Sequence, residues 1–151
     1  MEPLNITIEG VLVSPLKQIP NELGDVLHMM RNDSSLFMGC GEIYFSEIKP
    51  GCIKAWKRHR KMTQHIAVPV GKIRLVLYDD RSGSPSRGEM MELSLGRPAT
   101  YSLVRIPHGI WYGFRNIGAH TALIANCTDI PHDPEESESS GADAGPIPYR
   151  W

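Results

Sequence analysis

The chain has 151 residues, of which 41% are hydrophobic, and its formal net charge is −1. This length suits one domain with a sizeable core, and the near-zero net charge gives no general attraction for nucleic acid. No apolar run approaches the roughly 20 residues that a bilayer crossing needs, and the first residues lack the basic and then apolar pattern of a secretory signal. We therefore expect a cytoplasmic protein without a nucleic-acid or membrane partner.

Short alternating or apolar runs recur along the chain between Gly, Pro and Asp turn signals, a pattern typical of an all-β sandwich or barrel. We expect strands at 6–13, 42–48, 52–56, 66–70, 73–78, 90–95, 101–106 and 119–126. In the fifth run Ile73, Leu75 and Leu77 alternate with other residues, which predicts one fully buried face. Only 21–31 could hold a short helix, and Gly24 weakens that prediction.

The composition changes near residue 132. From 132 to 145 the chain is rich in Asp, Glu, Ser, Gly and Pro, a composition that cannot bury enough apolar surface to order itself. The last residues, 147–151, are apolar and aromatic again and are expected to dock on the barrel or on a partner subunit. The sequence thus predicts a barrel domain over 1–131, including an N-terminal strand segment, and an acidic polar tail over 132–151 with an apolar end.

Residues 51–71 have the spacing of the first cupin metal motif, in which Gly is followed by five residues, His-x-His, four residues, Glu, six residues and Gly. The first His position falls on Lys57, the second on His59, the Glu position on Gln64 and the closing Gly on Gly71. The frame therefore resembles that of a cupin, a double-stranded β-helix or jelly-roll barrel. A metal site would keep only His59, and an ammonium at Lys57 would repel a cation.

The second cupin motif, Pro-x-Gly-x-x-His-x-x-x-Asn, is matched by Pro107, Gly109 and Asn116, while its His position holds Tyr112. A phenol in this ligand position can donate a proton or a hydrogen bond. Together the two motifs predict a barrel with neither a metal nor any other cofactor.

A basic run follows from Lys54 to Lys61. On a strand, residues two apart share a face, so Lys57 and His59 point one way and Arg58 and Arg60 the other. The cupin frame turns Lys57 and His59 toward the interior, where an unpaired ammonium is costly without an anion. The run is thus expected either to face an anionic ligand such as phosphate or carboxylate, or to form a solvated surface.

Two further histidines and two tryptophans are weaker candidates. His65 and His108 could take part in chemistry, although a lone histidine is more often a packed or surface residue. Trp56 and Trp111 could line the mouth of the barrel and stack on a base or sugar, or could be core aromatics.

Four segments resemble those of one family. GCIKAWKRH resembles GVLRGLHYQ, VGKIRLVLYDDRSGSPSRG resembles a strand and its "DLR-GSPTFG" loop, IPHGIWYGF resembles IPPGFAHGF, and NCTDIPHDPEE resembles KCTDYYHPE. These are segments of the dTDP-4-dehydrorhamnose 3,5-epimerases, the RmlC-like cupins, and the resemblance covers nearly the whole chain in order. It implies an isomerase of polysaccharide biosynthesis that works as a homodimer on a dTDP-linked 4-keto-6-deoxyhexose, by proton abstraction alpha to the ketone.

The resemblance also implies a rebuilt site. The family's catalytic His falls on Lys57, its Tyr on Ala125 and its enolate-stabilising Lys on Gln64, so the chain is expected to be a divergent member that lacks the usual His and Tyr. We expect Lys57 beside the enolate, His59 or His65 as the base and Tyr112 as the acid. The residues expected to bind substrate are Lys54, Trp56, Gln64, Arg74, His108 and Trp111.

Two alternatives follow from the same segments. One is a catalytically inactive cupin that binds a sugar nucleotide or another anion. The other is a sugar 3,4-ketoisomerase, because IPHGIW also resembles the IPPGIW of those enzymes, although their paired histidines are not matched in the first motif.

Overall fold

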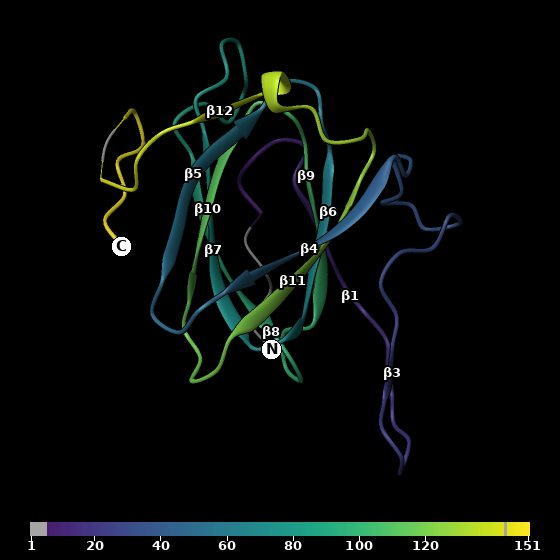
Figure 1. Cartoon of the computed structure of the whole chain (residues 1–151). Helices are drawn as coiled ribbons and strands as arrows, with labels where there is room; N and C mark the ends of the chain where they lie inside the picture. Colours follow the sequence, from purple (N-terminus) through teal and green to yellow (C-terminus); the bar gives the residue numbers. More distant parts are fainter. Residues whose placement is uncertain (1–5, 144) are drawn as a thin grey trace.

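A computed structural model of the chain describes residues 6–143 and 145–151, and its main elements are two five-stranded antiparallel sheets that face each other (Figure 1). The first sheet has the order β1 (Leu12–Pro15), β9 (Ser102–Ile106), β6 (Gln64–Val70), β11 (Ala122–Thr128) and β4 (Glu42–Ile48). The second has the order β12 (Ser137–Ser139), β5 (Ile53–His59), β10 (Ile110–Asn116), β7 (Lys72–Asp79) and β8 (Met90–Gly96). Consecutive strands often lie in different sheets, as in a jelly-roll barrel, and the all-β prediction is confirmed.

The core lies between the two sheets. Ile73, Leu75 and Leu77 are completely buried there, as their alternation in the sequence predicts. Side chains of β6 and β9 from the opposite sheet, among them Ile66 and Val104, belong to the same core. Full burial of each such aliphatic side chain contributes about 1.5–3 kcal/mol, so the core holds the two walls of the barrel at a defined separation.

The short helix expected over 21–31 is absent. The segment instead forms a hairpin of β2 (Gln18–Ile19) and β3 (Val26–Leu27), which extends away from the barrel in Figure 1. Its turn is closed locally: the Leu23 N–H donates to Asn21 Oδ1 at 2.9 Å, and Gly24 has a φ of +132°. A side-chain bond to the backbone and a positive φ both compete with a helix, and the helix prediction was wrong.

Strand β10 is the main element that the pattern of runs misses. Its middle residue, Gly113, adds no apolar side chain to the pattern, yet a glycine is required there because neighbouring side chains leave no room for a Cβ atom. A Cβ atom at this position would lie 2.6 Å from the Cβ of Ala55 and 2.9 Å from the Trp151 ring. Both faces of the strand are covered, so no polar and apolar alternation marks it.

The first part of the acidic segment, residues 134–139, belongs to the barrel. A 3₁₀ helix, η1 (Pro134–Glu136), precedes β12, which pairs with β5 along the sheet edge. Glu138 of β12 accepts hydrogen bonds from both Arg58 and Arg60 of β5. The expectation of an unordered segment is corrected here, because ladder hydrogen bonds and ion pairs replace the apolar burial that the composition lacks.

The end of the chain packs on the outer face of the second sheet. Ile147, Tyr149 and Trp151 join Trp56 and Val76 in a second apolar cluster, with the Trp56 and Trp151 ring centroids 5.1 Å apart. Docking on the barrel was one of the two alternatives expected for this segment. No helix in the described ranges is long and apolar enough to span a membrane.

Candidate active site

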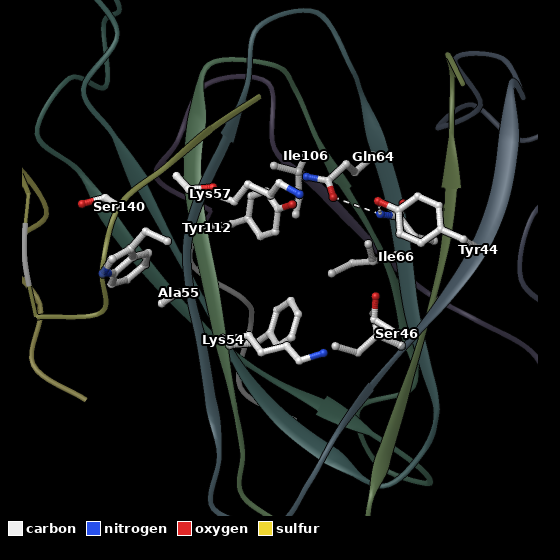
Figure 2. Close-up of a pocket in the computed structure, with 15 residues that line it drawn as sticks. Tyr44, Ser46, Lys54, Ala55, Lys57, Gln64, Ile66, Ile106, Tyr112 and Ser140 are labelled. Atoms are coloured by element: carbon white, nitrogen blue, oxygen red, sulfur yellow. Dashed lines mark hydrogen bonds between the residues drawn. The ribbon is translucent and has the colours of Figure 1, made fainter. Parts of the chain in front are cut away.

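A cavity of about 440 Å³ opens between the two sheets, within the size range of small-molecule sites. One wall is formed by β5 and β10 of the second sheet, and the other by β4, β6 and β11 of the first. Figure 2 shows Lys57 and Tyr112 reaching into the space from the first wall, and Tyr44 reaching in from the second. We call these the β5/β10 wall and the β4/β11 wall.

An irregularity in β5 brings two lysines to the cavity. Tyr112 of β10 pairs with Lys57, whereas the next residue, Gly113, pairs with Ala55, so Trp56 is an extra residue on β5. Such a β-bulge interrupts the alternation of faces. As a result Lys54 and Lys57, three residues apart, both line the cavity.

Behind Tyr112 lies a line of hydrogen-bonded side chains. The Tyr112 Oη is 3.0 Å from His59 Nε2, and the two rings stack with their planes 13° apart. His59 Nδ1 in turn contacts the carboxylate of Glu136. The other oxygen of Glu136 accepts from the backbone N–H groups of Lys61 and Met62 at 3.1 and 3.2 Å. Glu136 is thus held in place by η1 and by the turn after β5.

The electrostatics of this line favour a neutral His59. Burial lowers the pKa of His59 and outweighs the opposing effect of Glu136. Burial alone would raise the pKa of Glu136, but hydrogen bonds from His59 and from the backbone outweigh it, so this pKa is lowered. Burial also raises the pKa of Tyr112. We therefore assign the His59 proton to Nδ1, where it is donated to the carboxylate, and Nε2 accepts the hydrogen bond of the Tyr112 hydroxyl.

On the β4/β11 wall, the side-chain amide of Asn126 connects two cavity residues. Its Nδ2 donates to Tyr44 Oη at 3.1 Å and to Gln64 Oε1 at 2.9 Å. The Oδ1 atom of Asn126 is buried and has no partner among the described residues. The wall thus presents amides and one phenol to a ligand.

Six of the residues singled out in the sequence gather at the cavity. Lys54, Trp56, Lys57, Gln64 and Tyr112 line it, and His59 lies directly behind Tyr112. Lys57 and His59 share the inner face of β5, as the strand geometry predicts, while Arg58 and Arg60 lie on the outer face with Glu138.

Four other candidates lie elsewhere. His65 is completely buried, with Nδ1 2.7 Å from the Cys127 carbonyl oxygen and Nε2 3.0 Å from that of Leu36. Both ring nitrogens thus contact backbone oxygens, and His65 does not line the cavity. A histidine that pins a loop to a strand in this way has a structural role, so it is removed from the candidate bases.

The other three lie outside the barrel interior. Trp111 donates from Nε1 to Asp80 at 3.0 Å and is covered by the Arg58 guanidinium, 4.6 Å from its ring centroid. Arg74 interacts with Tyr149 on the outer face of β7. His108 is exposed in the turn between β9 and β10. None of the three lines the cavity.

Sequence reasoning missed Tyr44, Asn126 and Glu136. For Tyr44 a signal exists, since Tyr44 and Ser46 alternate with Ile43 and Phe45 as on a strand with two distinct faces. Glu136 gives none, because it lies 77 residues from His59 in a segment of acidic residues that look alike. Within the described ranges, no three His, Cys, Asp or Glu side chains gather in a way that could hold a metal ion.

Comparisons with known proteins place this geometry in a family. No protein-family model matches the chain. The chain is 54% identical to a crystal structure of a dTDP sugar isomerase from Desulfovibrio desulfuricans, with a TM-score of 0.95 and coverage of 99% of this chain and 95% of that one. It is 31% identical over 144 residues to a probable low-salt glycan biosynthesis epimerase, Agl13 of Haloferax volcanii, covering 94% of this chain and 88% of the relative.

The chain belongs to the RmlC-like family of sugar epimerases and isomerases. A further relative, the spore coat polysaccharide biosynthesis protein SpsL of Bacillus subtilis, is 29% identical over 146 residues, covering 95% of this chain and 96% of SpsL. Membership in the RmlC-like family confirms the resemblance noted in the sequence and makes the protein an isomerase of the epimerase type.

Proposed function

We propose that this RmlC-like protein isomerises a nucleotide-linked 4-keto-6-deoxyhexose, with dTDP as the nucleotide, by removing a proton alpha to the C4 ketone. The observation that carries the proposal is the line from Glu136 through His59 to Tyr112, which ends at the cavity beside Lys57. Enolate formation requires a base that accepts the proton and a cation that stabilises the enolate oxygen. Here His59, held in one tautomer by Glu136, can accept the proton through Tyr112, and Lys57 is the cation.

The proton moves along this line in two linked transfers. The Tyr112 oxygen takes the proton from C3 or C5 of the sugar while its own proton passes to Nε2 of His59. The electrons of the broken C–H bond become those of an enolate on C4. The imidazolium formed at His59 is stabilised by the carboxylate of Glu136, at the moment when the charge develops.

Lys57 supplies the cation for the enolate oxygen. It lies directly opposite Tyr112 in the β5–β10 register, and neighbouring side chains in such a pair are about 5 Å apart. Its ammonium can therefore contact the C4 oxygen while Tyr112 contacts the adjacent carbon. This arrangement carries out the epimerase-type chemistry with residues other than those at the family's usual His and Tyr positions.

The remaining cavity residues bind the substrate in this proposal. Lys54 lines the cavity and is exposed, and its amine donates to the Glu47 carbonyl at 2.6 Å. An ammonium there suits a diphosphate. Gln64 presents its amide between the two tyrosines. Trp56 borders the cavity, but its ring packs in the outer cluster against Trp151, so it is a core aromatic and does not stack on the ligand in this proposal.

We further propose that the protein is a homodimer. In support, β4 exposes Ile43 and Phe45 at 57% and 63%, and the β2–β3 hairpin exposes Leu23 at 99%. Light scattering tests this: a dimer has twice the 16.9 kDa mass of one chain, and a particle of 16.9 kDa would contradict it. The cytoplasmic location stays a prediction, which cell fractionation tests.

Proton NMR of the protein with dTDP-4-keto-6-deoxyglucose in deuterium oxide tests the proposed reaction. Loss of the C3 or C5 proton signal is expected, because the abstracted proton exchanges with solvent. Intact signals with broadened ligand lines would instead identify a binding cupin without activity. Intact, sharp lines would show that the ligand class is wrong.

A further inference from the structure

Tyr44 faces the cavity from the wall opposite Tyr112 and Lys57 (Figure 2). It lies on β4, the edge strand of the first sheet, and pairs in register with Asn126 of β11. Its neighbours Ile43 and Phe45 point outward and are exposed, so the alternation of the strand turns Tyr44 and Ser46 inward. The phenol is thus positioned by strand geometry rather than by a loop.

The hydrogen bonds of Tyr44 leave its proton available to a ligand. Its oxygen accepts from Asn126 Nδ2, whose second hydrogen is donated to Gln64 Oε1. Among the described residues, none accepts a hydrogen bond from the Tyr44 hydroxyl. Burial raises the pKa of Tyr44, so it stays a phenol at neutral pH, while the Asn126 bond acts in the opposite direction by stabilising the phenolate.

Inversion at a carbon requires that the proton return on the face opposite to its removal. Tyr112, His59 and Glu136 form one hydrogen-bonded line on the β5/β10 side and can serve only one face of the sugar. The two lysines of the cavity also belong to β5. On the β4/β11 wall the lining residues are apolar side chains, the amides of Gln64 and Asn126, the Ser46 hydroxyl and Tyr44.

Of these groups, the phenol is by far the strongest acid. A serine hydroxyl and carboxamides do not give up a proton to an enolate carbon at useful rates. The β4/β11 wall therefore offers one proton donor of suitable strength among the described residues.

We propose that Tyr44 is the catalytic acid that protonates the enolate carbon from the face opposite Tyr112, and this rests on the proposed function. The Tyr44 O–H bond breaks as the enolate electron pair forms the new C–H bond and the C4 carbonyl is restored. The phenolate that remains is held by the N–H of Asn126. After product leaves, water returns a proton to Tyr44 and takes one from His59, so no further reactant is needed.

The test compares wild type with Tyr44→Phe on dTDP-4-keto-6-deoxyglucose in deuterium oxide, with two readouts. One is loss of the C3 and C5 proton signals, which reports proton removal. The other is the appearance of the epimer through its remaining ring-proton signals, which reports inversion. In Tyr44→Phe we expect inversion to slow by roughly 10²–10⁴-fold while exchange stays within about threefold of wild type.

A matched control is Tyr78→Phe, on the outer cluster away from the cavity, which should retain both readouts. Asn126→Ala is a second variant, which removes the donor to the phenolate; it should slow inversion more than exchange. It also keeps the proposal testable if Tyr44→Phe folds poorly.

The outcomes separate the two proposals. If wild type and Tyr44→Phe both exchange and both invert at similar rates, Tyr44 is not the acid, although the proposed function stands. If wild type neither exchanges nor inverts, the proposed function is wrong, and the role of Tyr44 is overturned with it. If Tyr44→Phe loses both exchange and inversion, Tyr44 takes part in proton removal, which also contradicts the assignment.

Discussion

Strand β5 carries Lys57 and His59 on its inner face and Arg58 and Arg60 on its outer face. Outside, Arg58 is held by Asp80 at 2.7 Å and by Glu138, and Arg60 by Glu138 at 2.9 Å. Inside, Lys57 has no carboxylate within ion-pair distance among the described residues, and His59 is kept neutral beside a carboxylate.

The comparison shows that residues of one basic run have two different roles, because successive side chains of the strand point to opposite faces. The outer arginines fasten β12 to the barrel edge, and η1 just before β12 supplies Glu136 to the inner histidine. Fully paired outer charges therefore serve structure, while the inner cation and the inner histidine remain available for chemistry. Variants on the two faces should differ accordingly in activity and stability.

Replacing the inner histidine should have the largest effect. His59→Gln removes the proton acceptor behind Tyr112, and turnover should fall by roughly 10²–10⁴-fold. Single-turnover rates on the 4-keto sugar nucleotide measure this. His108→Gln, an exposed histidine outside the cavity, is the control and should match wild type. A His59→Gln variant as active as the control would remove His59 from the mechanism.

Lys57→Met should reduce kcat by roughly 10²–10³-fold, the loss expected when one group that stabilises developing charge is removed. Lys54→Met, which changes the other cavity lysine, should instead raise KM, because Lys54 faces the bound diphosphate rather than the enolate in our proposal. Steady-state kinetics of the two variants separate the roles. A similar rise in KM for both, with kcat unchanged, would argue that Lys57 only binds the substrate.

Glu136→Gln tests the positioning residue behind His59 and should slow turnover by roughly 10- to 100-fold through loss of orientation. The pH profile gives the more specific readout. In wild type the rate should fall on the acid side as His59 becomes protonated, below its ordinary pKa of about 6.5 because burial lowers that pKa. The carboxylate favours the protonated form, so its removal should move this acid limb to still lower pH. If the acid limb of the pH–rate profile is the same in Glu136→Gln as in wild type, a group other than His59 controls it.

The smallest effect is expected on the outer face. Arg58→Ala removes the ion pairs to Asp80 and Glu138, whose side chains are partly exposed, so the free energy of unfolding should fall by about 1 kcal/mol. Thermal unfolding should show this as a decrease in Tm of about 2–4 °C. Turnover should stay within about threefold of wild type, in contrast to the inner-face variants. A large loss of turnover with unchanged Tm would contradict the division between the faces.

The sequence predicts the barrel and the β5 wall because both follow from local patterns. Alternation identifies Ile73, Leu75 and Leu77 as core, and the motif spacing brings Lys57, His59 and Tyr112 to one place. The remaining site depends on contacts between distant segments.

Glu136 reaches His59 only because β12 adds to the sheet edge, which no local pattern indicates. Tyr44 faces the cavity because β4 pairs with β11, a relation set by the order of strands in the sheet. The sequence offers His65 and His59 equally as the base. Only the structure shows that His65 is sealed, because its ring contacts the carbonyl oxygens of Cys127 and Leu36.

The most direct test of the central claim is the rate of deuterium wash-in at C3 and C5 of dTDP-4-keto-6-deoxyglucose, measured in parallel for wild type and Tyr112→Phe. If the proton leaves the sugar through Tyr112 to His59, wild type incorporates deuterium and Tyr112→Phe does so at least roughly 10²-fold more slowly, with an unchanged Tm. Wash-in at the wild-type rate in Tyr112→Phe would contradict the account, because the line from Glu136 to Tyr112 would then not carry the proton.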